Sequence, residues 1–323
     1  MSYPLVSIVG TTATGKTDVA LALAEAAVAS EKYSRVHLIS ADSRQVYRDL
    51  PILSGADVPE DFELLEFSEF EFSPFINKDK TILLHGVSML AATDEWSVAV
   101  FREFALKIMR TAFAQNELVI VVGGTGLYHK HLLQTDPDLN VPPNEVWRAE
   151  AAALSVEELQ KLLASEAPER FEAMNNSDKN NPRRLQRALE IVRAHTEPLP
   201  AWQSELIANT KQLYFGVSIT AEKLTDRIAK RVQKRLQQGV LDEVSAALQL
   251  GAVADSQFAT TLGFAELAAH VSDEISELDA VGSWTISEVQ YAKRQQVWWK
   301  KQSDVVWLTH PVDVAALLEN IAE

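Results

Sequence analysis

The sequence predicts an α/β protein in which a helical insertion domain interrupts a parallel sheet core. Three observations lead to this prediction. Short apolar runs alternate with helical patterns along most of the chain, a glycine-rich loop follows the first apolar run, and one long stretch carries helical patterns only. Continuous apolar strands separated by helices are typical of a parallel sheet that is covered on both faces.

Four apolar runs predict the strands of this sheet. Each is short and rich in β-branched residues, as buried strands are. They are Leu5 to Val9, Val36 to Ile39, Leu118 to Val122, and Leu213 to Ile219. Helical patterns cover Asp18 to Ser30, which is rich in alanine, and much of the chain after Ile219, including Ala221 to Gln238 and Ser287 to Gln302.

The insertion is delimited by helix breakers. Thr135-Asp136-Pro137-Asp138 opens it and Pro198-Leu199-Pro200 closes it, and the patterns between them are helical, as in Val156 to Ala164 and Arg183 to Ala194. We therefore expect a core formed by residues 1–133 and 197–323, and an insertion formed by residues 134–196.

The composition excludes several kinds of site. The 323 residues contain no cysteine, which rules out disulfides, thiolate zinc sites and cysteine nucleophiles. No run of 18 or more apolar residues predicts a membrane span, and no basic stretch followed by an apolar one predicts a secretory signal. We expect a cytoplasmic protein, and a monomer as the default.

The charge is unevenly distributed. The net charge is −15, which by itself argues against a polyanionic partner. Asp49 to Asp79 contains nine acids and one base, whereas Lys179 to Arg235 contains twelve bases and five acids. Two interpretations of the basic region stay open: it presents a local surface to RNA, or it solvates long helices.

The loop after the first predicted strand fits the phosphate-binding pattern G-x-x-x-x-G-K-[ST], and it opens a helix. Its glycines let backbone N–H groups approach a phosphate, Lys16 supplies a positive charge, and the hydroxyl of Thr17 can hold Mg²⁺. The loop predicts a P-loop NTPase-like core. Its residues are Gly10, Thr11, Thr12, Ala13, Thr14, Gly15, Lys16 and Thr17.

Two further loops should converge on this phosphate site. Asp42 follows the second predicted strand, and Gly123 to Thr125 follow the third. In a doubly wound sheet, ligands bind beyond the carboxyl ends of the strands. A motor-type NTPase would be expected to carry a magnesium-binding acid after such a strand, but here the strand runs into Gly-Gly-Thr-Gly, so ATP hydrolysis is not favoured.

Six segments, in order along the chain, resemble the tRNA dimethylallyltransferase (tRNA isopentenyltransferase) family, in its bacterial form without a cysteine–histidine zinc finger. The phosphate loop alone is generic, whereas the segments that contain Asp42 and Tyr291 are specific. The six are the loop at 10–17, Ile39 to Arg48, Val122 to Tyr128, Asn181 to Glu190, Arg227 to Val232 with Gly239 and Glu243 downstream, and Gln290 to Gln295 followed by Trp298.

The resemblance implies transfer of a dimethylallyl group from dimethylallyl diphosphate to N6 of the adenosine just 3′ of the tRNA anticodon, with release of diphosphate. It implies that Asp42 is the general base, that Lys16 and Mg²⁺ hold the diphosphate, and that Thr12, Thr125 and Arg227 contact it. An acid before Ser-Arg-Gln could instead cap a helix, and this alternative for Asp42 stays open.

The resemblance also implies contacts with the tRNA anticodon stem-loop. Asp42, Ser43, Arg44 and Gln45 would contact the extruded base. Arg183, Arg184 and Arg187, on one predicted helix, could follow phosphates, as could Lys293, Arg294 and Gln295 near Trp298 and Trp299. For Trp298 alone, packing in the core is the favoured role.

The sequence departs from the family pattern near the substrate mouth. Val289 replaces the usual arginine before Gln290, and Pro51 to Asp57 replaces the usual D-I-G-T-A-K-P, which removes a lysine. These departures bear on RNA affinity more than on the chemistry.

Three other functions share parts of this pattern. An adenylate isopentenyltransferase, which acts on free AMP, ADP or ATP, has the same loop and aspartate but does not need the basic insertion. A small-molecule kinase would need a lid of arginines, which Arg227 to Arg235 could imitate. A catalytically silent tRNA-binding relative would explain the departures but not the intact Thr12, Lys16, Thr17 and Asp42.

Overall fold

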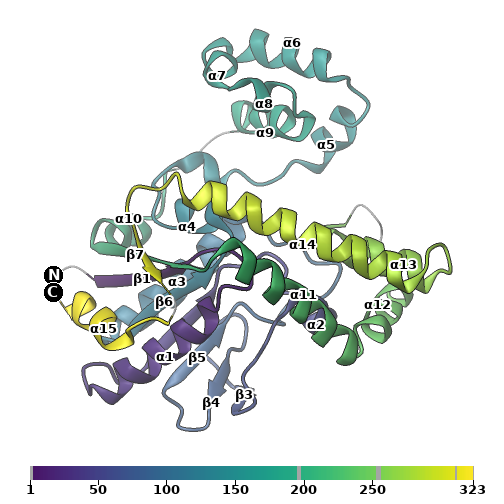
Figure 1. Cartoon of the computed structure of the whole chain (residues 1–323). Helices are drawn as coiled ribbons and strands as arrows, with labels where there is room; N and C mark the ends of the chain where they lie inside the picture. Colours follow the sequence, from purple (N-terminus) through teal and green to yellow (C-terminus); the bar gives the residue numbers. More distant parts are fainter. Residues whose placement is uncertain (1–2, 195–197, 252–255, 310, 323) are drawn as a thin grey trace. The chain divides into compact units, whose positions relative to one another are not determined.

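The computed structural model describes residues 3–194, 198–251, 256–309 and 311–322 (Figure 1). The chain divides into two compact units, one formed by Met1–Leu133 and Leu206–Glu323 and the other by Gln134–Glu205. The insertion therefore begins at residue 134, as predicted. It ends at Glu205, after the boundary predicted at residues 196 and 197, which lie outside the described residues.

The larger unit is built on a mixed sheet whose described strands run in the order β3-β4-β5-β2-β6-β1-β7-β8. The six from β5 to β8 in this order pair in parallel. All four predicted strands are present, as β1 (Tyr3–Val9), β2 (Val36–Ser40), β6 (Leu118–Gly123) and β7 (Thr210–Ser218). Each of β1, β2 and β6 is apolar and almost wholly buried because helices cover both faces of the sheet.

One edge of the sheet is antiparallel, which corrects the expectation of a purely parallel sheet. There, β3 (Phe62–Leu64) pairs with β4 (Phe75–Asn77), and β4 pairs with β5 (Ile82–His85). Asn77 Oδ1 accepts the backbone N–H groups of Thr81 and Ile82, at 2.8 and 2.9 Å. A connection this short permits only a hairpin, since a parallel crossover needs a dozen or more residues.

Helices cover both faces of the sheet. On one face α1 (Lys16–Ala29) packs with α15 (Val314–Ala322). On the other face α3 (Val98–Ala114) packs against β2 and β6. The remaining helices of this unit are α2 (Pro51–Ser54), α4 (Gly126–Leu132), α11 (Ala221–Gln237), α12 (Val240–Gln249), α13 (Phe264–Val271) and α14 (Glu277–Trp299), with α10 (Ala201–Ala208) at the boundary. No helix in the described ranges is long and apolar enough to cross a membrane.

Two elements of the C-terminal part differ from the expectation. The strand β8 (Val305–Thr309) pairs with β7 in a region that was expected to be helical. The helix α14 begins at Glu277 instead of Ser287, because the Ser276 side chain accepts the N–H of Asp279 and caps an earlier start.

The smaller unit is helical, as predicted. It contains α5 (Glu145–Ala151), α6 (Val156–Glu166), α7 (Pro168–Ala173), α8 (Asn176–Lys179) and α9 (Pro182–Arg193). Its own core is formed by Trp147, Leu159, Leu163, Leu185 and Leu189, all of them buried. The helical periodicity of the sequence therefore matches a separate apolar core.

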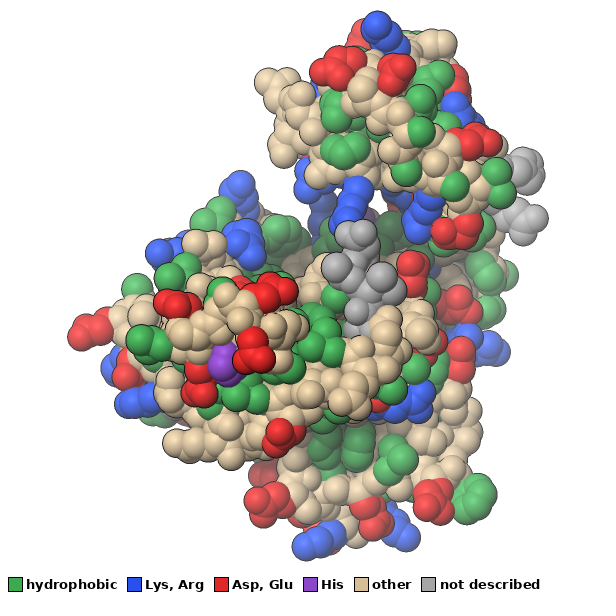
Figure 2. Space-filling view, turned by 90° about the vertical axis from the view of Figure 1, so that its right-hand side faces the viewer, with side chains coloured by type: hydrophobic (Ala, Val, Ile, Leu, Met, Phe, Trp, Pro, Cys, Tyr) green, Lys and Arg blue, Asp and Glu red, His purple; other side chains and the backbone are tan. Residues whose placement is uncertain are grey.

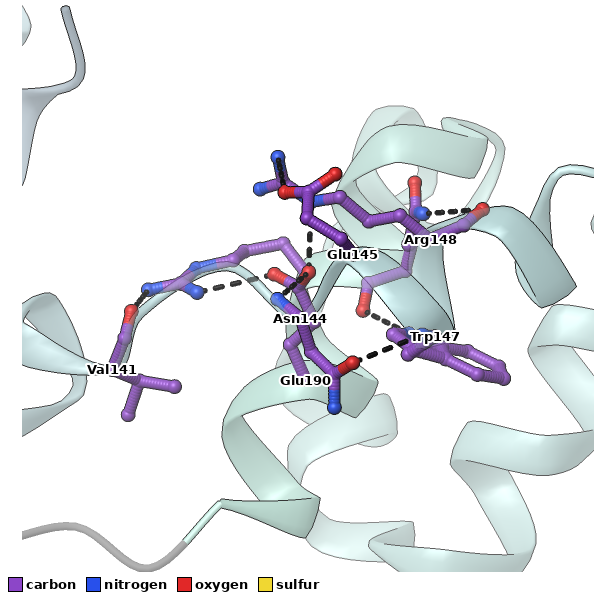
Figure 3. Close-up of polar contacts among 8 residues, drawn as sticks. Val141, Asn144, Glu145, Trp147, Arg148 and Glu190 are labelled. Carbon is purple, nitrogen blue, oxygen red and sulfur yellow. Dashed lines mark hydrogen bonds and ion pairs between the residues drawn. The ribbon is translucent and has the colours of Figure 1, made fainter. Parts of the chain in front are cut away.

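A buried carboxylate links the segments of this unit (Figure 3). Glu190 accepts the backbone N–H of Asn144 at 3.1 Å and forms ion pairs with Arg148 at 2.8 Å and Arg187 at 3.1 Å. Burial disfavours ionisation of Glu190, but the Asn144 N–H and the two guanidinium groups outweigh it and lower its pKa. Glu190 thus joins α9 to the segment before α5.

Replacement of this carboxylate should destabilise the helical unit. We expect Glu190→Gln to lower the free energy of unfolding by about 2 kcal/mol, since Arg148 and Arg187 would lose a buried partner but keep access to water. Because the pKa of Glu190 is lowered on folding, its contribution should be complete above the ordinary value of 4.5 and be lost as the pH falls through the lowered value. Urea unfolding and hydrogen exchange of α9 amides would measure both effects.

The matched control is Glu145→Gln, which removes an exposed partner of the same Arg148, at 3.5 Å. This exposed pair should contribute well under about 1 kcal/mol. Equal effects of the two substitutions would show that Glu190 has no special role.

Candidate functional site

The carboxyl ends of three strands meet at one cavity in the larger unit. Because β6 lies between β1 and β2 in the sheet, the loops that follow these strands are neighbours. The cavity has a volume of about 660 Å³. The phosphate loop, Asp42 and Gly123-Gly124 line one part of it, and side chains of α11 and α14 line another. The predicted convergence of the three loops is confirmed.

The phosphate loop has the backbone shape that its sequence predicts. Gly15 has a φ of 89° and precedes α1, and Ala13 has a φ of 61°, which is unusual for a residue with a side chain. The Thr14 hydroxyl donates to Thr11 O at 2.9 Å, and Lys16 Nζ donates to the same carbonyl at 2.5 Å. These two bonds join the middle of the loop, at Thr11, to its end and to the first residue of α1.

Lys16 lies in a strongly positive environment. Burial and, to a smaller extent, the charge of Arg231 lower its pKa from the ordinary 10.5 to about 8, whereas Asp42 opposes the fall. A buried lysine near an arginine is costly unless an anion compensates it. The site therefore favours a ligand with negative charge next to Lys16.

Asp42 lies in the same cavity but caps no helix. Its Oδ1 accepts the backbone N–H groups of Arg44, at 2.8 Å, and Gln45, at 3.4 Å, and so closes a turn. No hydrogen bond to Oδ2 is present in the described part of the chain. The carboxylate is thus held by one oxygen, while the other can accept a proton from a ligand. Burial raises the pKa of the nearby Tyr291 hydroxyl to about 12, and the charge of Asp42 contributes.

Three arginines on one face of α11 form a wall of the cavity: Arg227, Arg231 and Arg235. Arg227 Nη1 donates to Thr14 O at 3.3 Å, which places it against the phosphate loop. Arg231 and Arg235 were not predicted as site residues. The available signal was the spacing: Arg231 lies four residues after Arg227 and Arg235 four residues after Arg231, which puts all three on one helix face.

The wall is balanced by one carboxylate that the sequence analysis missed. Glu288 of α14 pairs with Arg231 at 2.8 Å and with Arg235 at 3.0 Å, and it lines the cavity. The adjacent Val289, where the family has arginine, packs instead in an apolar cluster with Leu224, Ile228 and Ala292.

The α14 helix packs on the phosphate loop through Gln295. Its Oε1 accepts the Thr12 N–H at 2.8 Å, and its Nε2 lies so close to Gly124 that a side chain there would overlap it. Trp299 Nε1 donates to Gly124 O at 3.2 Å. Gln295 also lines the cavity, so its contact with RNA stays a prediction, while its Oε1 is used within the protein. Trp298 packs over Gly126, as the core interpretation requires.

Thr125 lies behind the cavity lining. Its hydroxyl is buried beside the Tyr291 hydroxyl, and it meets no partner in good hydrogen-bond geometry in the described part of the chain. The role of Thr125 at a bound diphosphate stays a prediction. Thr12 itself lines the cavity.

The predicted base-contacting residues lie on the Asp42 side of the cavity. Ser43, Arg44 and Gln45 all line it. Arg44 Nη1 donates to Gln257 O at 2.6 Å. Gln45 accepts the Ser40 hydroxyl at 2.8 Å and donates to Gly55 O at 2.7 Å. These contacts fix the orientation of both side chains.

The predicted phosphate-contacting residues differ in their availability. Within the helical unit, Arg183 is exposed and Arg184 is exposed but paired with Asp178. Arg187 donates to Asp138 O at 3.2 Å and Val141 O at 2.7 Å besides its pair with Glu190, so we revise its role from RNA contact to structural contact. On α14, Arg294 lines the cavity and stacks over Tyr291, while Lys293 is exposed outside it.

The donor set of the phosphate loop fits Mg²⁺. Thr17 and Asp18 line the cavity beside Lys16 and offer oxygen atoms, the ligands that Mg²⁺ prefers. In the described ranges, no cluster of three or more His, Cys, Asp or Glu side chains could hold a metal ion. An ion at Thr17 would thus need ligand oxygens and water to complete its shell.

The chain is similar to known proteins over nearly its whole length. The family model described as IPP transferase matches residues 45–302. The tRNA dimethylallyltransferase of Oleidesulfovibrio alaskensis is 29% identical over 97% of this chain and 95% of that protein. The corresponding protein of Zymomonas mobilis is 32% identical over 95% of this chain and 90% of that protein.

Solved structures agree with these sequence matches. The full-length tRNA isopentenylpyrophosphate transferase from Bacillus halodurans has a TM-score of 0.65 and 25% identity, and the match covers 99% of this chain and 95% of that chain. The predicted fold class, a P-loop α/β core with a helical insertion, is confirmed.

The lowered pKa of Lys16 predicts proton uptake on anion binding. Inorganic diphosphate bound beside Lys16 would raise its pKa, so at pH 8 the protein should take up about half a proton per site, because about half of the Lys16 side chains are neutral before binding. Affinity should fall as the pH rises above 8. Calorimetry in buffers of different ionisation enthalpy would measure this uptake.

The control is Lys16→Arg, which stays protonated in this range. At pH 8 this variant should take up about half a proton less per site than the wild type, which is the amount that Lys16 accounts for. Protons that diphosphate itself gains or loses on binding are the same in both proteins. Identical uptake would show that Lys16 is not the titrating group.

Proposed function

This chain belongs to the IPP transferase family, and we propose that it transfers a dimethylallyl group from dimethylallyl diphosphate to N6 of the adenosine just 3′ of the tRNA anticodon, releasing diphosphate. The observation that carries the proposal is the joint exposure of Lys16 and Asp42 to one cavity. One end of this cavity suits a polyanionic leaving group, and the other offers a proton acceptor.

The cationic part of the cavity suits the donor. Cleavage of the allylic C–O bond transfers negative charge to the diphosphate, and Lys16, Arg227 and Arg231 lie where they would stabilise that charge. Mg²⁺ at Thr17, when bound, would add positive charge to the same oxygens. The interactions strengthen as the charge develops, so they favour the transition state over the bound substrate.

Asp42 suits the acceptor. The N6 amine of adenine is a weak nucleophile because its lone pair is delocalised into the ring, and it must lose a proton when the new C–N bond forms. The turn contacts to Oδ1 orient the carboxylate, and Oδ2 would receive this proton. Gln45, fixed by Ser40 and Gly55, lies beside it and could contact the base edge.

The helical unit would supply part of the tRNA surface. Acidic and basic side chains are interspersed on the face shown in Figure 2. Arg183 and Arg184 on α9 are the exposed candidates in this unit. No specific observation favours the adenylate-type enzyme, the kinase or the silent relative.

The test is product analysis with two acceptors. Purified protein would be incubated with dimethylallyl diphosphate, Mg²⁺ and unmodified tRNA that carries adenosine at the target position, and a parallel reaction would contain AMP. Nuclease digestion and mass spectrometry should find N6-isopentenyladenosine from tRNA only. Product from AMP only would assign the adenylate-type activity, and no product from either acceptor would contradict the proposal.

Removal of the carboxylate should abolish most of the turnover. We expect Asp42→Asn to lower kcat by roughly 10²–10⁴-fold, because a general base contributes about that much. The amide keeps an oxygen for the Arg44 N–H, so tRNA binding should persist. Single-turnover kinetics and filter binding would separate the two effects, and unchanged turnover would rule Asp42 out as the base.

Exposed arginines of α9 should contribute to the salt dependence of tRNA binding. Each of Arg183→Ala and Arg184→Ala should reduce the slope of log K against log [salt] by about 0.7–0.9, the value for one lost phosphate contact. Lys161→Ala, an exposed base of α6 in the same unit, is the control. If all three variants give the wild-type slope, α9 makes no phosphate contact.

A further inference from the structure

Arg235 is a buried cation that the proposed chemistry does not use. It is 4% exposed, and its ion-pair partner Glu288 is 3% exposed. Burial and, to a smaller extent, the charge of Arg231 lower the pKa of Arg235 to about 10, while Glu288 and Asp57 oppose the fall. Removing two charges from water is costly, and such a pair often adds little net stability. Its position in the cavity wall suggests another role.

The guanidinium of Arg235 lies against the turn that ends α2. Its Nη2 occupies the space where a side chain at Gly55 would begin, and Gly55 has a φ of 67°. This turn belongs to Pro51–Asp57, the segment that replaces the family's usual lysine-containing motif. The turn and Arg235 thus fit each other: glycine gives room for the guanidinium, and Asp57 supplies a nearby negative charge.

The same turn is bound on its other side. Glu243 of α12 accepts the N–H groups of Ile52 and Leu53, at 2.7 and 2.8 Å, and so fixes the start of α2. Gly55 O accepts Gln45 Nε2 at 2.7 Å. A continuous series of contacts therefore leads from Glu288 through Arg235 and Gly55 to Gln45, next to Asp42.

We propose that Arg235 and Glu288 are positioning residues, which hold the Gly55 turn and through it orient Gln45 on the acceptor side of the cavity. The predicted change in KM rests on the proposed function, whereas the predicted change in hydrogen exchange of the turn does not. Neither residue needs to touch the donor diphosphate. Their loss lets the turn move and misplaces Gln45, so it weakens recognition of the adenine much more than binding of the donor.

The kinetic test compares Arg235→Met, Glu288→Gln and the double variant with Lys234→Met, which removes an exposed charge from the same helix. Each single variant should raise KM for tRNA about tenfold. In Arg235→Met, KM for dimethylallyl diphosphate should stay within about threefold; Glu288→Gln is judged on KM for tRNA alone, because Glu288 also pairs with Arg231. The double variant should resemble the single ones, since both residues act through one contact series. Lys234→Met should match the wild type.

A second measurement does not depend on activity. Hydrogen exchange of the amides of Ile52, Leu53, Gly55 and Ala56, all hydrogen-bonded in this turn, should be at least about tenfold faster in Arg235→Met than in Lys234→Met. If Arg235→Met does not fold, Arg235→Lys keeps the buried charge but shortens the group that touches Gly55, and it should give an intermediate increase in both readouts.

Unchanged exchange in the turn would overturn the inference, whatever the activity of the protein. In Arg235→Met, an equal or larger rise in KM for the donor would also overturn it, because Arg235 would then bind the diphosphate. Faster exchange in a protein that prenylates no tRNA would support the positioning role and contradict the proposed function alone.

Discussion

The burial of Lys16 among arginines is the constraint on which the rest of the site depends. The Lys16 ammonium group donates to Thr11 O of the phosphate loop at 2.5 Å, and Arg231 brings a second positive charge near it. Glu288 of α14 offsets part of this charge through its pair with Arg231, and Asp42 lines the same cavity. What remains is an excess of positive charge in a cavity of about 660 Å³, which a diphosphate would neutralise.

The core of the fold was predictable because its strands are buried on both faces and therefore continuously apolar. The strand β8 was not, since Val306 and Trp307 are exposed and its sequence lacks that signal. The strands β3 and β4 have three residues each, and a side-chain turn at Asn77 sets the pairing of β4 with β5. Such short elements depend on contacts that periodicity does not reveal.

The phosphate loop and Asp42 were predictable because their chemistry follows from local sequence and from their place at strand ends. Glu288 was not, because its partners lie on another helix, more than fifty residues away along the chain. Gln295 and Arg187 were assigned to RNA, but their partners include backbone atoms distant in sequence, which only the tertiary structure brings near. A polar side chain in a family motif can thus serve the scaffold instead of the substrate.

Thermal unfolding in the presence of three ligands tests most directly whether this positive charge binds a diphosphate. Each ligand is used at the same multiple of its dissociation constant. A ligand whose binding is not detected is used at the highest concentration reached with the other ligands. The three ligands are inorganic diphosphate, a dimethylallyl diphosphate analogue with sulfur in place of the bridging oxygen, and ATP, each with Mg²⁺. The account predicts that the analogue binds without tRNA and stabilises the protein by about 2.7 kcal/mol at one hundred times its dissociation constant. Stabilisation by ATP, with none by the analogue or by diphosphate, would contradict it.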